Sequence, residues 1–403
     1  MKIVLSLLVI VSSLSTVHAQ SLSVAGANAL DSYLQSAIGS TRIPGMVALV
    51  TNGEEVIYEY AFGLMDSANN KTMTADAIFR LASMTKAVTS TGIMLLVEDG
   101  LVALDAPASE YLPDLQPPGI LESFSSTAFM AHDAAGEMTV RQLLTHTSGL
   151  GYSFTSEFLN TFQSGTANNR ATELPLLFEP GTGWQYGEST RVLGEIIEAV
   201  SGQELSAFLE QRLLAPLGMT DTAYDIPASK NSRVVTVHRF DGTSLNEVPN
   251  PAGMISSPHQ GDGGLSGTAS DYASFIRLFL NAGLTGDTRL LDADTVALMG
   301  QNHTAPVVVG LMHSTNKLTS EDFPLGAGID SYGLGFQRTE SQVPGMRPVG
   351  SLAWAGIYNT EFWIDPVNGI GAVLLMQYLP FYDADAIEVL QGFEQRIYAN
   401  LQD

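Results

Sequence analysis

The sequence predicts an α+β protein with strands near both ends of the chain and a mainly helical middle. Strand-like runs lie at residues 45–66 and again after about residue 330, and amphipathic helical patterns dominate between them. Blocks of strands and helices in this order favour a sheet layer beside a helical region over alternating βαβ units. We expect residues 20–80 and 330–403 to form the sheet layer and residues 81–329 the helical region.

The first elements are a helix and a hairpin. Leu30, Leu34 and Ile38 recur at intervals of four, which predicts an amphipathic helix from residue 30 to about 40. Two β-rich runs then flank Asn52-Gly53, a dipeptide that is typical of a tight hairpin turn.

The helical region begins with the run at 80–100, which contains an uninterrupted apolar stretch and ends at Gly100. Residues 105–137 are expected to be irregular because four prolines interrupt them. A short helix restarts after Thr139, which forms a capping-box pattern with Gln142.

The remaining elements follow from periodicity. Helical patterns occupy 189–202, 204–218 and 270–283, the last with Ser270 as the expected N-cap. Strand patterns follow at 332–339, 350–365 and 369–378, and a final helix at about 384–400.

Composition narrows the classes of function. The 403 residues carry a formal net charge of −24, which repels nucleic-acid phosphates and anionic lipid. The absence of cysteine excludes a cysteine nucleophile, a cysteine-ligated metal and a lipoprotein anchor. We expect no nucleic-acid partner and no membrane insertion.

The N-terminus has the pattern of a signal peptide. Lys2 precedes a short apolar run, and Val17-His18-Ala19 fits cleavage after Ala19. The run is too short to span a bilayer. We therefore expect residues 1–19 to be removed and the protein to be exported, either to a periplasm or out of the cell.

Ser83 and Lys86 are the first candidates for chemistry. Side chains three residues apart share one helix face, and the free N–H groups at a helix start favour negative charge. A serine there beside a buried lysine has the outline of an activated nucleophile. Taken alone, the pair is more often a capping serine with a lysine whose amine reaches solvent, because chance often supplies a motif as short as Ser-x-x-Lys.

Three further segments give the pair a context. "HTSGL" at 146–150, "PGTGWQYGEST" at 180–190 and "WAGIYNTEFWIDP" at 354–366 follow it in order. With them the chain resembles the serine β-lactamase and penicillin-binding-protein superfamily, and is most similar to the family VIII carboxylesterases, which are related to class C β-lactamases. The resemblance implies a β-lactamase-like fold: an antiparallel sheet flanked by helices, with the active site between it and the helical region.

The resemblance also implies roles for individual residues. Ser83 would be the nucleophile, with Lys86 and Tyr186 as the groups that move its proton. The chemistry agrees, because an ammonium beside a phenol favours the tyrosinate, which can accept the serine proton. The backbone N–H groups of Ser83 and Ile357 would form the oxyanion hole.

Substrate contacts are expected from the third motif and from Glu188. Trp354 and Gly356 belong to Trp-Ala-Gly, which stands where lactamases have Lys-Thr-Gly. Glu188 replaces the asparagine of the lactamase Tyr-x-Asn motif, and it is either a first-turn helix carboxylate or a cleft residue that would repel anions. Asn359 stands where the esterases often have glycine, so the resemblance does not fix the pocket shape beyond Trp354.

The absence of other known catalytic motifs excludes further classes of enzyme. The chain has no Gly-x-Ser-x-Gly elbow, and its seven histidines show no His-Glu-x-x-His spacing, so we expect neither an α/β-hydrolase nor a metal or other cofactor. His146 is expected to make a structural hydrogen bond.

The leading interpretation is a serine carboxylesterase that cleaves small neutral esters through an acyl-enzyme on Ser83. The alternatives are a β-lactamase or D-alanyl-D-alanine peptidase on the same fold and, more remotely, an inactive module that binds cell-wall peptides.

Overall fold

The computed structural model describes residues 20–117, 119–163, 171–248 and 258–402. The expected signal peptide at 1–19 lies outside these residues. Within them, no helix has the length and apolarity that crossing a bilayer would require.

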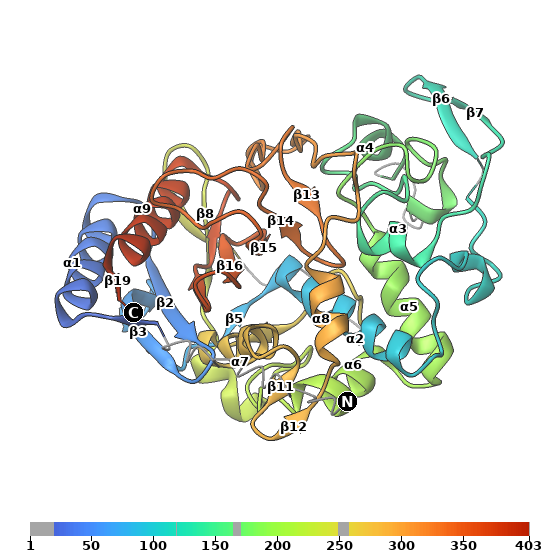
Figure 1. Cartoon of the computed structure of the whole chain (residues 1–403). Coiled ribbons are helices and arrows are strands. Elements are labelled where there is room, and N and C mark those ends of the chain that lie inside the picture. The colour runs from blue at the N-terminus through green and yellow to red at the C-terminus, as the bar shows by residue number, and fades with distance from the viewer. Residues whose placement is uncertain (1–19, 118, 164–170, 249–257, 403) are drawn as a thin grey trace, which may run out of the picture.

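The fold is organised around one eight-stranded antiparallel sheet, which confirms the predicted α+β class (Figure 1). In spatial order its strands are β13 (Ser331–Tyr332), β14 (Gln337–Arg338), β15 (Leu352–Gly356), β16 (Thr360–Asp365), β17 (Ile370–Leu375), β2 (Gly45–Asn52), β3 (Val56–Asp66) and β4 (Lys71–Thr72). Strand β2 pairs with β17, so the two ends of the chain meet in the middle of the sheet. The Asn52-Gly53 turn joins β2 to β3, as predicted.

The central strands are buried on both faces. In β2, Met46, Ala48 and Val50 belong to one hydrophobic cluster, whereas Val47 and Leu49 belong to another. Alternate side chains of a strand point to opposite faces. The sheet therefore separates two cores, and its central strands read as continuous apolar runs.

Two long terminal helices cover one face of the sheet. Helices α1 (Val24–Ser40) and α9 (Ala384–Asn400) lie side by side and fill the smaller core with Leu30, Leu34 and Phe393 (Figure 1). Helix α1 begins six residues before the predicted start, because Ser23 caps it by accepting a hydrogen bond from the N–H of Gly26.

The opposite face carries the helical region. Helix α7 (Ala269–Leu280) packs directly on β2, β16 and β17. Helix α2 (Thr85–Glu98) is buried from residue 85 to residue 96 and contacts α5 and α6. The other helices are α3 (Val140–Leu144), α4 (Glu157–Gln163), α5 (Ser189–Ser201), α6 (Leu205–Leu209) and α8 (Ala293–Met299).

Short helices and small sheets connect these layers. The 3₁₀ turns are η1 (Ala82–Met84), η2 (Ala108–Glu110), η3 (Ala171–Glu173) and η5 (Ala228–Arg233), and η4 (Glu210–Leu214) is a π-helical turn. The remaining strands are β1 (Ser21–Leu22) with β19 (Leu401–Gln402), β5 (Phe79–Arg80) with β10 (Ser266–Gly267), β6 (Ile120–Phe124) with β7 (Phe129–His132), β11 (Leu284–Thr285) with β12 (Thr288–Arg289), and β8 (Val237–Phe240) with β9 (Leu245–Val248) and β18 (Tyr378–Leu379).

The structure corrects three local predictions. The region 105–137 contains the β6–β7 hairpin, which extends away from the body of the molecule (Figure 1). The single strand expected at 332–339 is two short strands, because Gly335 adopts φ +98° and turns the chain between them. The N-cap of α7 is Thr268 and not Ser270, since the Thr268 hydroxyl accepts the N–H of Asp271 at 3.1 Å.

Candidate active site

Ser83 lies in the turn η1, between β5 and the start of α2. The residue before it, Ala82, has φ +47°, a left-handed conformation that a non-glycine residue adopts only when its surroundings enforce it. Two side chains fix this segment to the sheet. The Gln377 amide bonds to both backbone groups of Arg80, and the Thr360 hydroxyl donates to the carbonyl of Leu81 at 3.3 Å. The turn of Ser83, in which only Ser83 itself is partly exposed, is therefore held by buried contacts to the segment just before it.

Lys86 is 1% exposed, one turn after Ser83. Its ammonium donates to the Asp262 carbonyl at 2.6 Å and to the Ser83 Oγ at 3.2 Å. It also lies 4.8 Å from the ring centroid of Tyr186 and 5.3 Å from that of Tyr152. These hydrogen bonds and cation–π contacts offset the cost of burying the charge.

Two tyrosines flank Lys86 in different states. Tyr152 donates a short hydrogen bond to the Asp262 carboxylate, and burial, followed by the Asp262 charge, raises the pKa of Tyr152 well above its usual value. The Tyr186 hydroxyl is buried and has no hydrogen-bond partner in the described part of the chain. Of the two tyrosines beside Lys86, Tyr186 is thus the one whose hydroxyl makes no hydrogen bond to the described residues.

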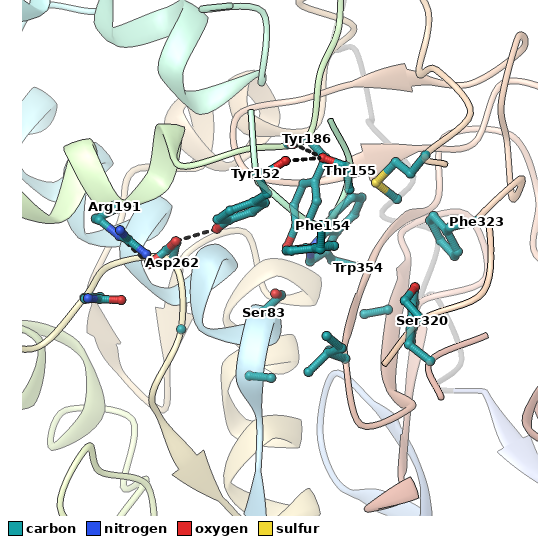
Figure 2. A pocket seen from close by; sticks show the side chains of 18 of the residues that line it. Ser83, Tyr152, Phe154, Thr155, Tyr186, Arg191, Asp262, Ser320, Phe323 and Trp354 are labelled. Carbon is teal, nitrogen blue, oxygen red and sulfur yellow. Dashed lines mark hydrogen bonds and ion pairs between the residues drawn. The ribbon is translucent and has the colours of Figure 1, made fainter. Parts of the chain in front are cut away.

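An ion pair between Arg191 and Asp262 lies beside Lys86 and the two tyrosines (Figure 2). The Arg191 guanidinium, on α5, is 3.5 Å from Asp262 Oδ1 and 3.3 Å from Glu188 Oε1. Burial opposes ionisation of Asp262, but the charges of Arg191 and Lys86 and the hydrogen bond from Tyr152 outweigh it, and the pKa of Asp262 is lowered. Asp262 is therefore a buried carboxylate that stays ionised.

Glu188 lies at the start of α5, which is one of the two positions predicted for it. It is the N-cap residue of α5, its carboxylate pairs with Arg191, and it is not among the residues that line the pocket around Ser83. The α5 backbone places its side chain on the Arg191 side of the helix start. Of the two roles predicted for it, the structure favours the helix-start carboxylate, and Glu188 acts as a counter-ion of Arg191.

The third motif forms the opposite wall. Trp354 and Gly356 lie on β15 and, with Ile357, line the same pocket as Ser83. A Cβ at Gly356 would collide with the carbonyl of Leu81 and the hydroxyl of Thr360, so only glycine allows β15 to approach the serine turn this closely. The oxyanion role of the Ser83 and Ile357 N–H groups stays a prediction.

Asn359 closes the turn after this motif. It has φ +56°, its amide donates to the carbonyls of Tyr378 and Pro380, and its oxygen accepts the N–H of Tyr382. Asn359 thus braces the strand connection and does not line the pocket.

His146 packs behind the site. Its ring lies 5.0 Å from Tyr186 and 5.4 Å from Tyr332, centroid to centroid, and is stacked at 6.3 Å on Trp354. Burial, followed by the charge of Lys86, lowers the pKa of His146 well below its usual value, so the imidazole is neutral. Its Nδ1 has no hydrogen-bond partner among the described residues, unlike the structural hydrogen bond that we expected.

These residues surround a pocket of about 220 Å³. Figure 2 shows Ser83 below the rings of Tyr186 and Trp354, with the Arg191–Asp262 pair on one side and Phe323 and Ser320 on the other. Phe154, Tyr224, Met312 and Phe381 add apolar surface to the remaining wall, which also contains the polar residues Thr155, His259, Gln260, His313 and Ser314. A small substrate with an apolar body fits such a lining.

Sequence reasoning missed three residues of this site: Tyr152, Arg191 and Asp262. Tyr152 follows "HTSGL" by only two positions, so its proximity to the site could have been inferred. Asp262 lies in the "GDGGLSG" turn, 176 residues from Lys86. No local pattern connects two positions so far apart.

Known proteins are similar to this chain over most of its length. The model of the Beta-lactamase family matches residues 30–392. A lovastatin esterase from Penicillium rubens is 30% identical, over 92% of this chain and 98% of its own. Esterase EstB from Burkholderia gladioli is 28% identical, over 86% of this chain and 89% of its own.

Solved structures are similar over the same range. The LovD6 mutant of simvastatin synthase (LovD) from Aspergillus terreus superposes with a TM-score of 0.80 at 26% identity, covering 93% of this chain and 97% of its own. EstCE1, a hydrolase with promiscuous acyltransferase activity, shares the fold with a TM-score of 0.76 at 23% identity, covering 93% and 100%. With its family match, its β-lactamase-like fold and its esterase and acyltransferase relatives, the chain belongs to the Beta-lactamase family of serine hydrolases and acyltransferases.

Proposed function

We propose that the protein is a serine carboxylesterase that cleaves small neutral esters through an acyl-enzyme on Ser83. The observation that carries this proposal is the wall opposite Ser83, where Trp354 stands in place of a lysine. Arg191 is the only lysine or arginine among the described pocket-lining residues, and its charge is already paired with Asp262 and Glu188. Among the described lining residues, a substrate carboxylate would therefore find no unpaired lysine or arginine.

The proposed reaction has two halves. Ser83 Oγ attacks the ester carbonyl carbon while its proton passes to the deprotonated oxygen of Tyr186, a tyrosinate that the positive charge of Lys86 stabilises. The tetrahedral intermediate collapses by breaking the bond to the alcohol oxygen, and that oxygen takes the proton from Tyr186. Water then attacks the acyl carbon by the same route and releases the acid and free Ser83.

The aromatic lining favours a second acceptor for the acyl group. Seven aromatic side chains line the pocket, and an apolar alcohol gains more from such a surface than water does. The relatives named as acyltransferases are consistent with this. We propose that alcohols compete with water for the acyl-enzyme, so that added alcohol yields a new ester.

A rate comparison tests the function. We expect kcat/KM for p-nitrophenyl butyrate to exceed that for benzylpenicillin and for a chromogenic cephalosporin, and Ser83→Ala to abolish all three activities. Faster turnover of benzylpenicillin would favour the lactamase alternative. Binding of cell-wall peptides without turnover of any substrate would favour the inactive module.

We also propose that residues 1–19 direct export and are removed after Ala19. The charged start, apolar run and small-residue site support this. N-terminal sequencing of the protein recovered from outside the cytoplasm should begin at Gln20.

A further inference from the structure

The two tyrosines beside Lys86 pose a question that the proposed function leaves open. Both rings lie within about 5 Å of the ammonium, and either hydroxyl could in principle accept the proton of Ser83. The structure distinguishes them by one contact. Tyr152 is bonded to the Asp262 carboxylate, whereas Tyr186 has no hydrogen-bond partner in the described residues.

Asp262 contacts this group through two different atoms. Its backbone carbonyl accepts the Lys86 ammonium at 2.6 Å, and its carboxylate accepts the hydroxyl of Tyr152. One residue thus fixes the positions of both the cation and the second tyrosine. Because a carboxylate next to a phenol opposes formation of the tyrosinate, Tyr152 remains a donor.

Arg191 offsets the cost of burying the ionised carboxylate of Asp262. Asp262 is only 7% exposed, and an unpaired buried charge is costly. With Arg191 and Lys86 as cations and Asp262 and Glu188 as anions, the four formal charges of the group cancel. The other titratable groups nearby are Tyr224 and Tyr332, which burial keeps protonated, and His146, which is neutral. His259 also lines the pocket, where it pairs with Asp225 and stacks on Tyr224.

We propose that Asp262 and Arg191 are a positioning pair that assigns different roles to the two tyrosines. Tyr152 is held as a protonated hydrogen-bond donor, and Tyr186 is left free to take the proton of Ser83. This inference rests on the proposed function, because it concerns the proton transfer that activates Ser83. Neither residue touches the reacting atoms.

The proposal predicts opposite pH shifts for the two partners. The negative charge of Asp262 opposes loss of a proton from the Lys86–Tyr186 unit, whereas the positive charge of Arg191 favours that loss. Asp262→Asn should therefore move the acidic limb of kcat/KM to lower pH, and Arg191→Gln should move it to higher pH. A charge a few ångströms away produces shifts of about one pH unit. The double variant, with both charges removed, should return close to the wild-type profile.

The experiment measures kcat/KM for p-nitrophenyl butyrate against pH in the wild type and the three variants. The rate at which a fluorophosphonate labels Ser83 is followed in parallel by intact mass. Shifts of opposite sign that cancel in the double variant support the proposal. Unshifted profiles, or two single variants that shift in the same direction, overturn it. If the wild type neither hydrolyses the ester nor is labelled, the proposed function itself has failed, and the two failures are thus distinguishable.

A second pair of variants decides the matter if the charge variants do not fold. Tyr152→Phe and Tyr186→Phe each remove one hydroxyl and keep the ring. The proposal expects Tyr186→Phe to reduce kcat about a thousandfold or more and Tyr152→Phe to reduce it about tenfold or less. If Tyr152→Phe lost as much kcat as Tyr186→Phe, or more, the proton transfer would be assigned to Tyr152 and the proposal would be overturned.

Discussion

At the scale of single residues, the central feature is a buried lysine, Lys86, whose contacts with the described residues include no carboxylate that would neutralise its charge directly. The Lys86 ammonium donates one hydrogen bond to the Ser83 Oγ and one to the carbonyl of Asp262. It also lies over the aromatic rings of Tyr152 and Tyr186. Such an ammonium both orients the nucleophile and stabilises negative charge on a neighbouring oxygen. The uncommitted hydroxyl of Tyr186 is the oxygen that can exploit this.

Lys86 and Tyr186 should therefore behave as one unit. Lys86→Ala and Tyr186→Phe are each expected to reduce kcat about a thousandfold or more, and the double variant should lose little beyond the larger single loss, because groups that act together are non-additive. Steady-state kinetics on the four proteins measures this. Losses that simply multiply in the double variant would show that the two residues act separately.

Trp354 should set the substrate class. Trp354→Lys introduces a cation opposite Ser83, and a charge-assisted contact with a carboxylate is worth about 1.5–3 kcal/mol, or roughly ten- to a hundredfold in binding. The ratio of kcat/KM for benzylpenicillin to that for p-nitrophenyl butyrate is expected to rise by about that factor. Trp354→Phe, which adds no charge, is the matched control, and a similar rise in that variant would refute the electrostatic explanation.

At the scale of elements, the site depends on how closely β15 approaches the serine turn. Gly356 lies against the carbonyl of Leu81, and Thr360 on the neighbouring strand bonds to that same carbonyl. The turn that carries Ser83 is therefore held directly against the sheet. A rigid scaffold of this kind preserves the geometry that acyl transfer needs.

Gly356→Ala tests this seating. The added Cβ has no room, so β15 or η1 must shift, and kcat/KM is expected to fall at least about a hundredfold because small misplacements of catalytic groups are costly. Gly39→Ala is the matched control, since nothing lies within 4 Å of its added Cβ on α1. That control should keep full activity and should be stabilised by up to about 1 kcal/mol. Full activity in Gly356→Ala would contradict the proposed dependence on close approach.

The elements also show what a sequence can and cannot predict. The Asn52-Gly53 hairpin and the Thr139–Gln142 capping box depend on neighbouring residues, and both are present as predicted. The β6–β7 hairpin was missed because prolines around it masked its short strands. Asp262 was missed because it contacts a residue 176 positions away in the sequence. The role of Glu188 was left undecided between two alternatives because sequence alone does not give the direction of its side chain.

At the scale of the whole molecule, a second buried charge cluster lies on the sheet face covered by α9. Arg347 makes a two-pronged ion pair with Glu394, at 2.8 and 2.6 Å, and is thereby committed to that partner. Glu361, on β16, lies nearby without an ion pair of its own among the described residues. Burial raises the pKa of Glu361 to about 8, against the opposing effect of Arg347.

The contribution of Glu361 to the stability of the fold should therefore decline as the pH rises from about 4.5 to about 8. Folded Glu361 holds its proton up to about pH 8, whereas the unfolded side chain releases it near pH 4.5, so folding takes up a proton between these values. This contribution is full below pH 4.5 and declines by up to about 1.4 kcal/mol per pH unit until pH 8.

Glu361→Gln should remove that decline. Urea unfolding at pH 5, 7 and 9 is expected to show the variant gaining stability relative to the wild type as the pH rises. Glu122→Gln, at an exposed position of β6, is the control and should run parallel to the wild type. A difference between Glu361→Gln and the wild type that does not change with pH would show that Glu361 is ionised in the folded protein.

The acyl-enzyme itself is the most direct test of the central claim. The protein is mixed with a slowly hydrolysed p-nitrophenyl ester, quenched in acid within the first turnover and examined by intact-mass and peptide-mapping mass spectrometry. We predict a mass increase equal to the acyl group, located on the peptide that contains Ser83, present in Tyr152→Phe and absent in Ser83→Ala. An adduct on another residue, or ester turnover that persists in Ser83→Ala, would contradict a Ser83 acyl-enzyme.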